Sequence, residues 1–505
     1  MNDVLKLNEV HLSTLPKQVL RPNYDRKQLS AGIVHIGLGN FHRAHQAWYL
    51  HRLMQQGKAY DWAIIGAGVR AYDREMRQKL LQQDCLTTLV SLDPAGTSVE
   101  VIGSMIDYLP IEEGQAALIA QMADPKIRIV SLTVTEGGYY IHPQSGEFDA
   151  AHQDIVHDVA HPDRPKTAFG AMVAALKLRR AAGYAPFTAQ SCDNLHDNGA
   201  ILRQVIISLA KLSDPDLADW IDKNGAFPNS MVDCIVPATG AKELACVREK
   251  GVDDSAPVTH ENFRQWVIED QFCASRPEWE SVGAILTDDI AGYEAMKIRI
   301  LNAGHQVLAN VGEILRIATI SACMQDDTIA AFFQKVESEE ILPYVDSVPD
   351  MTPQEYLVLI KQRFSNPIIQ DTTRRVAFDG SARHSSFVLP IVYDALNAQG
   401  SIQGLALVEA LWARMCAGTR EDDSVIKAND PHWGDLNMAA HAARNDPQAW
   451  LQQPFYGELA VSETFAEAFG YWLASLWSKG CRKTLEEYLS INSYPKMQSF
   501  YGIEP

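Results

Sequence analysis

A short apolar segment that runs directly into a glycine-rich turn is the feature that most constrains the fold of this chain. Residues 32–36 read GIVHI, and Gly37-Leu38-Gly39 follows at once. Branched apolar residues in such a short run are typical of a strand buried in a parallel sheet. A helical pattern then continues to Met54, so this segment predicts a strand, a tight turn and a helix.

The same alternation continues along the first half of the chain. Three more strand candidates each run into a turn rich in glycine or polar residues, with helical patterns between them. The strand candidates are residues 62–65, 127–133 and 186–190, and the clearest helical patterns are 114–122 and 168–182. Strands that alternate with helices predict an open parallel sheet, and therefore an α/β fold.

The second half of the chain carries a different pattern. Long helical patterns dominate beyond about residue 286, at residues 293–318, 353–364, 402–416 and 464–477. Thr352-Pro353-Gln354-Glu355 is a capping box for the second of these. At 505 residues the chain is longer than one core usually serves. We therefore expect a mixed α/β domain over residues 1–286 and a mainly helical domain over residues 287–505.

Composition argues against several classes of function. The net charge of -19 disfavours nucleic acid or an anionic membrane as a partner. No apolar run approaches the roughly 18 residues of a membrane span, and the N-terminal segment lacks the apolar core of a signal peptide. We therefore expect a cytoplasmic protein. The eight cysteines include no CxxC pair, so neither a structural zinc site nor a disulfide framework is predicted.

Gly37-x-Gly39-x-x-His42 is close to the dinucleotide-binding fingerprint but departs from it at the third position. Gly37 allows the tight turn, and Gly39 lets the backbone approach a pyrophosphate at a helix N-terminus. The third glycine normally lets helix and strand pack closely, which His42 is expected to prevent. A plain strand–turn–helix is the alternative, but the place of this turn after the first strand of an alternating region favours a nucleotide site.

Asp73 follows the second strand candidate, where an acidic residue can accept hydrogen bonds from the adenosine ribose. Its charge would repel a 2′-phosphate, so Asp73 favours NAD over NADP. The alternative is a solvated loop carboxylate, with Arg70 and Arg74 beside it as possible partners of a phosphate.

Residues 293–305, YEAMKIRILNAGH, place an amine, an amide and an imidazole on one predicted helix. At about 100° per residue, Lys297, Asn302 and His305 share one face. A lysine withdrawn from water has a lowered pKa and can act as a base. Asn302 and Asn194 can donate hydrogen bonds to the oxygen of a reacting alcohol, and His305 can bind that oxygen or its neighbour. Each residue alone also has an ordinary interpretation: Lys297 as a surface lysine, Asn302 as a helix asparagine and His305 as a core histidine.

Tyr293 and Lys297 also match the YxxxK pair of short-chain dehydrogenases, with Ser281 upstream. In that mechanism the tyrosine is the acid–base group and the lysine lowers its pKa. Such a pair arises readily by chance on a helix, and this one follows the sheet region. The tyrosine is therefore the minor alternative to Lys297.

Six motifs, in order along the chain, resemble the polyol-specific long-chain dehydrogenases. They are GLGNFHRAHQAWYLHRL (37–53), TVTEGGY (133–139), SCDNL (191–195), FPNSMVD (227–233), the Lys297/Asn302/His305 pattern and RFSNP (363–367). The family comprises mannitol 2-dehydrogenase, D-arabinitol 4-dehydrogenase and the fructuronate and tagaturonate reductases. In this family the histidine of GxGxFHRAH is usual, which accounts for His42.

The resemblance implies a Rossmann-type N-terminal domain that binds NAD, a mainly helical C-terminal domain, an active site between them without a metal, and a monomer. It implies Lys297 as general acid–base, with Asn194 and Asn302 holding the reacting oxygen. His305 would orient the substrate. The cofactor residues would be Gly37, Gly39, Asn40, Phe41, Asp73 and Glu136, the substrate residues Asp233, Arg375, Arg383 and His384, and the proton-path residue Glu294.

Departures from the family pattern concern the substrate. Arg383 stands where the mannitol enzymes have lysine, His384 follows where an apolar residue is expected, and Cys234 replaces an arginine. Arginine binds both carboxylates and hydroxyls, so the substrate residues suit either a sugar alcohol or a uronate. The segments GVRAYDRE and GNFHRAHQAWYLHRL favour the mannitol and arabinitol members. We predict an NAD-dependent polyol dehydrogenase, with a uronate reductase and a non-catalytic dinucleotide sensor as alternatives.

Overall fold

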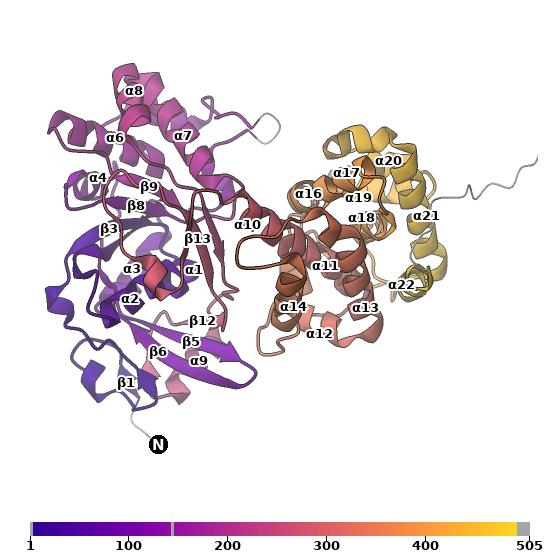
Figure 1. Ribbon diagram of the computed structural model, residues 1–505, viewed down its shortest axis with the longest axis horizontal. Coiled ribbons are helices and arrows are strands. Elements are labelled where there is room, and N and C mark those ends of the chain that lie inside the picture. Colours follow the sequence, from indigo (N-terminus) through magenta and orange to yellow (C-terminus); the bar gives the residue numbers. More distant parts are fainter. Residues whose placement is uncertain (1–3, 143–145, 492–505) are drawn as a thin grey trace, which may run out of the picture. The chain divides into compact units, whose positions relative to one another are not determined.

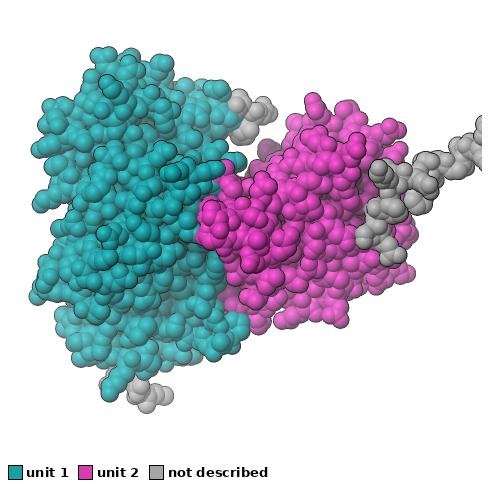
Figure 2. Space-filling model, in the orientation of Figure 1, with its two compact units in different colours: residues 1–290 teal, residues 291–505 magenta. Residues whose placement is uncertain are grey.

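The computed structural model describes residues 4–142 and 146–491. The chain divides into two compact units, Met1–Ile290 and Ala291–Pro505, which Figure 2 colours separately. The boundary expected from the sequence, after residue 286, lies shortly before this division. Every helix in the described part of the chain is too short or too polar to cross a membrane.

The first unit is built on a five-stranded sheet in which neighbouring strands are all parallel (Figure 1). In spatial order its strands are β7 (Met105–Tyr108), β4 (Ala63–Ala67), β3 (Ala31–Ile36), β8 (Ile129–Leu132) and β9 (Thr188–Ser191). Ile33, Val34 and Ile36 of the central strand are fully buried, which explains the apolar run in the sequence. The predicted open parallel sheet and α/β fold are confirmed.

Helices pack against both faces of this sheet. Apolar side chains of α2 meet one face, and those of α4, α6 and α7 meet the other. The helices of the first unit are α1 (Asn40–Ala44), α2 (Gln46–Gln55), α3 (Asp73–Leu81), α4 (Ala116–Ala123), α5 (Gln153–Ala160), α6 (Ala168–Ala181), α7 (Asn198–Ser213), α8 (Pro215–Asn224) and α9 (Ala241–Glu249).

The sequence does not predict the smaller sheets of the first unit. One has the order β12-β5-β6-β2, another the order β10-β13-β14, and β1 pairs with β11. Their strands are β1 (Leu5–Lys6), β2 (Val19–Leu20), β5 (Thr87–Asp93), β6 (Gly96–Ile102), β10 (Ser230–Asp233), β11 (Val252–Asp253), β12 (Val258–Glu261), β13 (Gln265–Glu269) and β14 (Ile285–Thr287). Segments far apart along the chain make these pairs, and local periodicity carries no signal for such pairing.

The second unit is helical, and none of its residues from 291 to 491 lies in a strand. Its central helix, α18 (Gln403–Cys416), is buried at every residue after the first, and α11 (Ala303–Leu315) and α21 (Glu463–Lys479) pack against it. The other helices are α10 (Ala291–Met296), α12 (Ile320–Gln325), α13 (Asp327–Val336), α14 (Pro353–Phe364), α15 (Thr373–Val376), α16 (Gly380–Arg383), α17 (Leu389–Asn397), α19 (Trp433–Ala443), α20 (Gln448–Leu451) and α22 (Cys481–Ser490).

Helix α14 begins at the predicted capping box. Glu355 N–H donates to Thr352 Oγ1 at 3.3 Å, and Thr352 N–H donates to Glu355 Oε2 at 2.9 Å. Each side chain thereby satisfies a backbone group that the helix leaves free. This prediction is confirmed.

Three π-helical turns interrupt the helices of the second unit. They are η6 (Lys297–Asn302), η7 (Glu337–Ile341) and η9 (His384–Val388), and η6 packs against the other two. The continuous helix expected over residues 293–318 is therefore wrong in detail, because α10, η6 and α11 succeed one another. The wider π turn invalidates the spacing of about 100° per residue between Lys297 and Asn302. Such turns are rare and occur frequently at functional sites.

A buried carboxyl group lies against the helix that follows η6. Glu337 is fully buried, and neither of its carboxyl oxygens has a hydrogen-bond partner. A Cβ atom at Gly304 would lie 2.5 Å from Glu337 Oε1, so the glycine makes room for this carboxyl. Burial raises the pKa of Glu337 well above its usual value, which keeps the group protonated at neutral pH.

Glu337→Gln is expected to raise the melting temperature at pH 7. The unfolded chain ionises this carboxyl near its ordinary pKa of 4.5, whereas the folded protein keeps the proton. The folded state is therefore disfavoured as the pH rises above that value, and the amide removes this effect. A gain of about 1 kcal/mol would raise the melting temperature by about 2–4 °C in a unit of this size.

The measurement is thermal unfolding followed by circular dichroism at pH 7 and pH 4. The difference between variant and wild type should shrink at pH 4, where the unfolded carboxyl is also largely protonated. Glu339→Gln, on the same π turn but exposed, is the control. A difference that is the same at both pH values would contradict the assignment.

Candidate functional site

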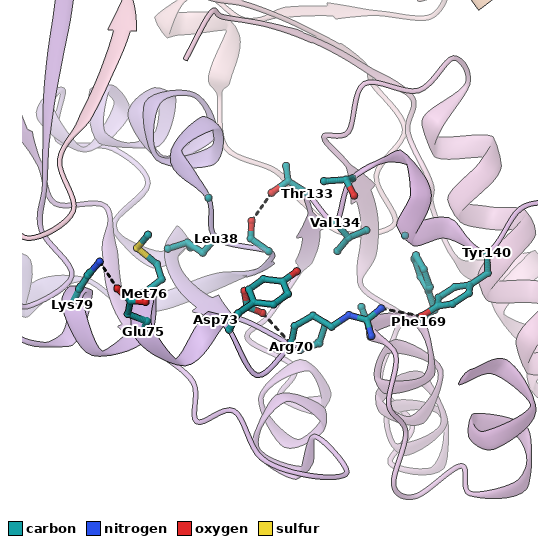
Figure 3. Close-up of a pocket in the computed structure, with 17 residues that line it drawn as sticks. Leu38, Arg70, Asp73, Glu75, Met76, Lys79, Thr133, Val134, Tyr140 and Phe169 are labelled. Carbon is teal, nitrogen blue, oxygen red and sulfur yellow. Dashed lines mark hydrogen bonds and ion pairs between the residues drawn. The ribbon is translucent and has the colours of Figure 1, made fainter. Parts of the chain in front are cut away.

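A pocket of about 440 Å³ lies at the carboxyl ends of β3, β4 and β8 in the first unit (Figure 3). Strand β3 has β4 on one side and β8 on the other, so the strand order reverses at this point. Ligands of open parallel sheets bind at such a reversal. Residues lining the pocket include Gly37, Leu38, Gly39, Val69, Arg70, Asp73, Met76, Thr133, Val134, Tyr140 and Phe169.

The two glycines of the fingerprint do different things. Gly37 has a φ of +88°, and a Cβ atom there would lie 2.1 Å from Thr133 O. The turn therefore needs glycine both for its backbone conformation and for its contact with β8. Gly39 has nothing within 4 Å of its Cβ position, which leaves open space on the pocket side of the turn. Such space suits a ligand that must approach the backbone closely.

His42 performs the packing that the third glycine usually allows, and the expectation that it prevents close contact is wrong. Its ring stacks on that of His35 in β3, with centroids 3.5 Å apart and planes at 19°. The His35 ring also forms hydrogen bonds with Ser131 Oγ in β8, at 2.8 Å, and with Thr133 Oγ1 just after β8, at 3.0 Å. Burial lowers the pKa of His35 to about 3 and that of His42 well below its usual value, so both rings are neutral.

Asn40 and Phe41 do not line this pocket. The Asn40 amide donates to Thr239 Oγ1 at 2.9 Å and to Pro237 O at 3.2 Å. The Phe41 ring stacks on His45. Both side chains hold α1 in place beside the glycine turn. Glu136 begins a 3₁₀ turn after β8, and its side chain lies outside the described residues.

Asp73 begins α3 and lines the pocket, as a ribose-binding carboxylate should. Its Oδ2 accepts a hydrogen bond from the backbone N–H of Arg70 at 3.0 Å. The Arg70 guanidinium instead reaches Tyr140 OH at 3.3 Å and lies 3.8 Å from Asp154 (Figure 3). Arg74 donates to Ile111 O. These contacts of the two arginine side chains are therefore with groups other than the Asp73 carboxylate.

Asn194 follows β9, Asp233 is the last residue of β10, and one bond joins the end of β9 to the start of β10. Ser230 Oγ in β10 donates to Ser191 O in β9 at 2.6 Å. Asp193 accepts two backbone N–H bonds from the segment after β8, at 3.0 and 2.9 Å. Asn194 is exposed and Asp233 is buried. Both therefore stand at carboxyl ends of strands in the first unit, and Asp193 ties one of these ends to the segment that lines the pocket.

In the second unit, Lys297, Asn302 and His305 are all buried, with 8%, 8% and 9% of their surfaces exposed. The first two begin and end the π turn η6, and His305 follows on α11. Asn302 Nδ2 and His305 Nε2 are buried atoms without a hydrogen-bond partner among residues 4–142 and 146–491. Buried donors of this kind are costly unless a ligand or water satisfies them.

The His305 ring is held by stacking on Phe364, with centroids 4.2 Å apart and planes at 20°. Burial lowers the pKa of His305 well below its usual value, and the positive charges of Arg375, Arg383 and Arg363 add to this effect. The imidazole is therefore neutral and can act as a hydrogen-bond donor through one nitrogen only.

Arg375 lies in an ion pair that the sequence does not predict. Its Nε and Nη2 donate to Asp371 Oδ1 at 2.7 and 2.6 Å. The other carboxylate oxygen, Oδ2, lies 3.6 Å from His305 Nε2. Arg383 donates to Val376 O at 2.9 Å. Asp371 lies two residues before the start of α15, so helical spacing does not predict its contact with Arg375.

His384 is not placed as a substrate-binding residue should be. It is fully buried, its Nδ1 donates to Glu409 Oε1 at 2.6 Å, and its Nε2 accepts from Asn310 Nδ2 at 3.1 Å. Its ring also stacks on Trp412. Both ring nitrogens therefore have hydrogen-bond partners, Glu409 and Asn310, inside the helical core. We therefore interpret His384 as a core residue.

Tyr293 does not have the environment of a catalytic tyrosine. Its hydroxyl donates to Asp350 Oδ1 at 2.8 Å. Burial, together with the charge of Asp350, raises the pKa of Tyr293 to about 12. The short-chain mechanism needs a lowered pKa instead. Glu294, the expected proton-path residue, is buried about one helical turn before Lys297.

Two family descriptions match most of the chain. Residues 31–281 match the mannitol dehydrogenase Rossmann domain, and residues 289–477 match the mannitol dehydrogenase C-terminal domain. A protein of Cereibacter sphaeroides named mannitol 2-dehydrogenase is 51% identical over 477 residues, which cover 94% of this chain and 100% of that protein. A mannitol 2-dehydrogenase of Phaeosphaeria nodorum is 38% identical, over 96% of this chain and 86% of that protein.

Two solved structures are also similar over nearly the whole chain. The first is Pseudomonas fluorescens mannitol 2-dehydrogenase in a ternary complex with NAD and D-mannitol, with a TM-score of 0.87 and 39% identity. It covers 96% of this chain and 99% of that one. The second is a substrate-free D-sorbitol dehydrogenase, with a TM-score of 0.86 and 32% identity, covering 95% and 100% of the two chains.

Alanine substitutions at the two glycines should separate folding from dinucleotide binding. Gly37→Ala strains the turn and collides with β8, so it should lower both the melting temperature and the affinity for NADH. The new methyl group of Gly39→Ala meets only open space, so the melting temperature should stay unchanged. The affinity for NADH should fall at least about tenfold, which corresponds to about 1.4 kcal/mol.

Fluorescence titration with NADH and thermal unfolding check both variants. Gly434→Ala, on α19 and also open at its Cβ position, is the control for a glycine outside the pocket. Unchanged NADH affinity in Gly39→Ala would remove this turn from the dinucleotide site.

Proposed function

The chain belongs to the mannitol dehydrogenase family, and on that premise we propose that it is an NAD-dependent polyol dehydrogenase. The reaction is the oxidation of mannitol at its second carbon to fructose, with its reverse. The observation that carries the proposal is the 51% identity, over the full length of the relative, with a protein named mannitol 2-dehydrogenase. The Gly37–Gly39 turn and Asp73, on a pocket at the strand reversal, suit the dinucleotide.

Lys297 is the proposed general base. NAD, when bound, supplies the acceptor for the hydride that leaves the alcohol carbon. Lys297 takes the proton of the reacting hydroxyl, because a buried amine is more readily held neutral than a solvated one. Asn302 Nδ2, a buried donor without a partner, stabilises the negative charge that develops on the oxygen. The family resemblance gives Asn194 the same task and Glu294 the task of passing the proton to solvent.

An amine base makes a metal ion unnecessary for deprotonating the alcohol. Lys297 begins a π turn, and its residue is only 8% exposed. A base that takes the proton itself needs no metal ion to ionise the alcohol. We therefore propose a metal-independent mechanism.

The ion pair of Arg375 and Asp371 suits a polyol better than a uronate. The carboxylate of a uronate requires a cation that is available for pairing. The guanidinium of Arg375 already bonds to Asp371 through two nitrogens. Its charge is therefore compensated, and Asp371 adds repulsion toward a second carboxylate nearby. The same two residues favour a neutral, hydroxyl-rich substrate.

We also propose a monomeric, cytoplasmic enzyme whose domains are residues 1–286 and 287–505. The negative charge of the chain and the family resemblance support these expectations. Size-exclusion chromatography with light scattering measures the oligomeric state.

Purified protein with NAD should reduce the cofactor when mannitol is added. The panel contains mannitol, arabinitol and sorbitol with NAD, and fructose and fructuronate with NADH, followed by NADH absorbance. Turnover of mannitol and fructose above the other compounds is the expected result. Preference for fructuronate would establish the uronate reductase instead, and no turnover of any compound would favour the dinucleotide sensor.

Lys297→Ala should lower kcat by about 10²–10⁴-fold, the usual contribution of a general base. Its NADH affinity should stay close to that of the wild type, because the dinucleotide pocket is in the first unit. Tyr293→Phe is the matched variant, since it removes only the hydroxyl that bonds to Asp350. Steady-state kinetics and NADH titration test the pair, and an inactive Tyr293→Phe beside an active Lys297→Ala would overturn the lysine mechanism.

A further inference from the structure

Two buried polar atoms in the second unit face each other across a gap. His305 Nε2 and Asp371 Oδ2 are 3.6 Å apart, which exceeds hydrogen-bond length, and neither atom has a hydrogen-bond partner in the part of the chain that the structure describes. The side chains are 11% and 6% exposed. An unsatisfied donor beside an unsatisfied acceptor is costly in a buried place, and a group that bonds to both removes the cost.

Both atoms are held where they are. Asp371 Oδ1 accepts two bonds from Arg375, and the backbone oxygen of Asp371 accepts from Ile320 N–H at 2.9 Å. The His305 ring is fixed by its stacking on Phe364. The unoccupied oxygen of Asp371 therefore stays directed at the imidazole.

The chemistry of the gap selects one kind of ligand group. A neutral imidazole with its proton on Nε2 donates one hydrogen bond, and an ionised carboxylate only accepts. A hydroxyl accepts from the first and donates to the second. A carbonyl cannot donate to Asp371, and a carboxylate meets electrostatic repulsion there. Of the groups carried by sugar alcohols, ketoses and uronates, the hydroxyl alone satisfies both atoms.

We propose that Asp371 is a substrate-binding residue, whose Oδ2 accepts a hydrogen bond from a non-reacting hydroxyl of the polyol while His305 Nε2 donates to that hydroxyl. The assignment rests on the proposed polyol dehydrogenase function. Asp371 then has two roles, because Oδ1 pairs with Arg375 and Oδ2 accepts a hydrogen bond from the substrate. Asp371 thereby contributes to the choice of a hydroxyl over a carboxylate at this point of the substrate.

The test combines one substitution with substrates that lack one hydroxyl. Wild type and Asp371→Asn are compared, with NADH, on fructose and on its 1-, 3-, 4-, 5- and 6-deoxy derivatives, which are distinct compounds because the ketose, unlike mannitol, has no symmetry. Asparagine retains an oxygen for Arg375 but places an N–H₂ group, which cannot accept, toward His305. In the wild type, removal of the bridging hydroxyl should lower kcat/KM about ten- to a hundredfold, as expected for a bond to a charged group.

Asp371→Asn should have a lower kcat/KM on fructose, mainly through a higher KM. Removal of the bridging hydroxyl should then lower its kcat/KM much less than it does in the wild type. The penalties at the other positions should be unchanged. Asp270→Ala is the control, because Asp270 forms a similar ion pair with Arg276 in the first unit, and it should leave every penalty as in the wild type.

Equal penalties in wild type and Asp371→Asn at every position would overturn the assignment and leave Asp371 as a support for Arg375. The wild type alone can also overturn the assignment. If no deoxy derivative lowers its kcat/KM more than about threefold, the substrate makes no hydrogen bond to a charged group, because such a bond is worth more. Turnover of mannitol by the wild type is read separately. Failure of that reaction would refute the proposed function, whereas failure of the deoxy comparison refutes only the role of Asp371.

Discussion

The second unit keeps several polar side chains buried with hydrogen-bonding capacity that the protein itself does not use. Asn302 Nδ2, His305 Nε2 and Asp371 Oδ2 have no hydrogen-bond partner among the described residues. Each such atom costs free energy in a buried place, whereas both ring nitrogens of His384 are paired. Within the mannitol dehydrogenase family, a hydroxyl-rich substrate is the natural partner for these atoms.

The first unit satisfies its constraints differently. There the glycine turn must approach β8, and the structure achieves this with Gly37 at a positive φ and with two stacked, neutral histidine rings beneath the turn. His42 therefore takes a place in which most dinucleotide-binding turns carry glycine. The open space at Gly39 is what remains for the ligand.

The features that could be predicted from the sequence are those with a local signal. Strand β3 and its turn, the parallel sheet and the capping box at Thr352 all follow from neighbouring residues. The π turn does not, because Lys297–Asn302 has no distinctive sequence pattern, and an ordinary helix was the natural expectation. Asp371 was missed because folding alone brings it to His305, and His384 was misassigned because it adjoins Arg383 in sequence while its ring points into the core.

The central claim is that Lys297 is the acid–base group of a polyol dehydrogenase. A crystal structure of the unreactive complex with NADH and mannitol tests it most directly, since both substrate and nicotinamide are then held in place without turnover. The account predicts Lys297 Nζ within about 3.2 Å of the hydroxyl oxygen on the second carbon of mannitol, a hydrogen-bond distance. A complex in which Tyr293, a water or a metal ion occupies that position, with Lys297 bonded elsewhere, would contradict it.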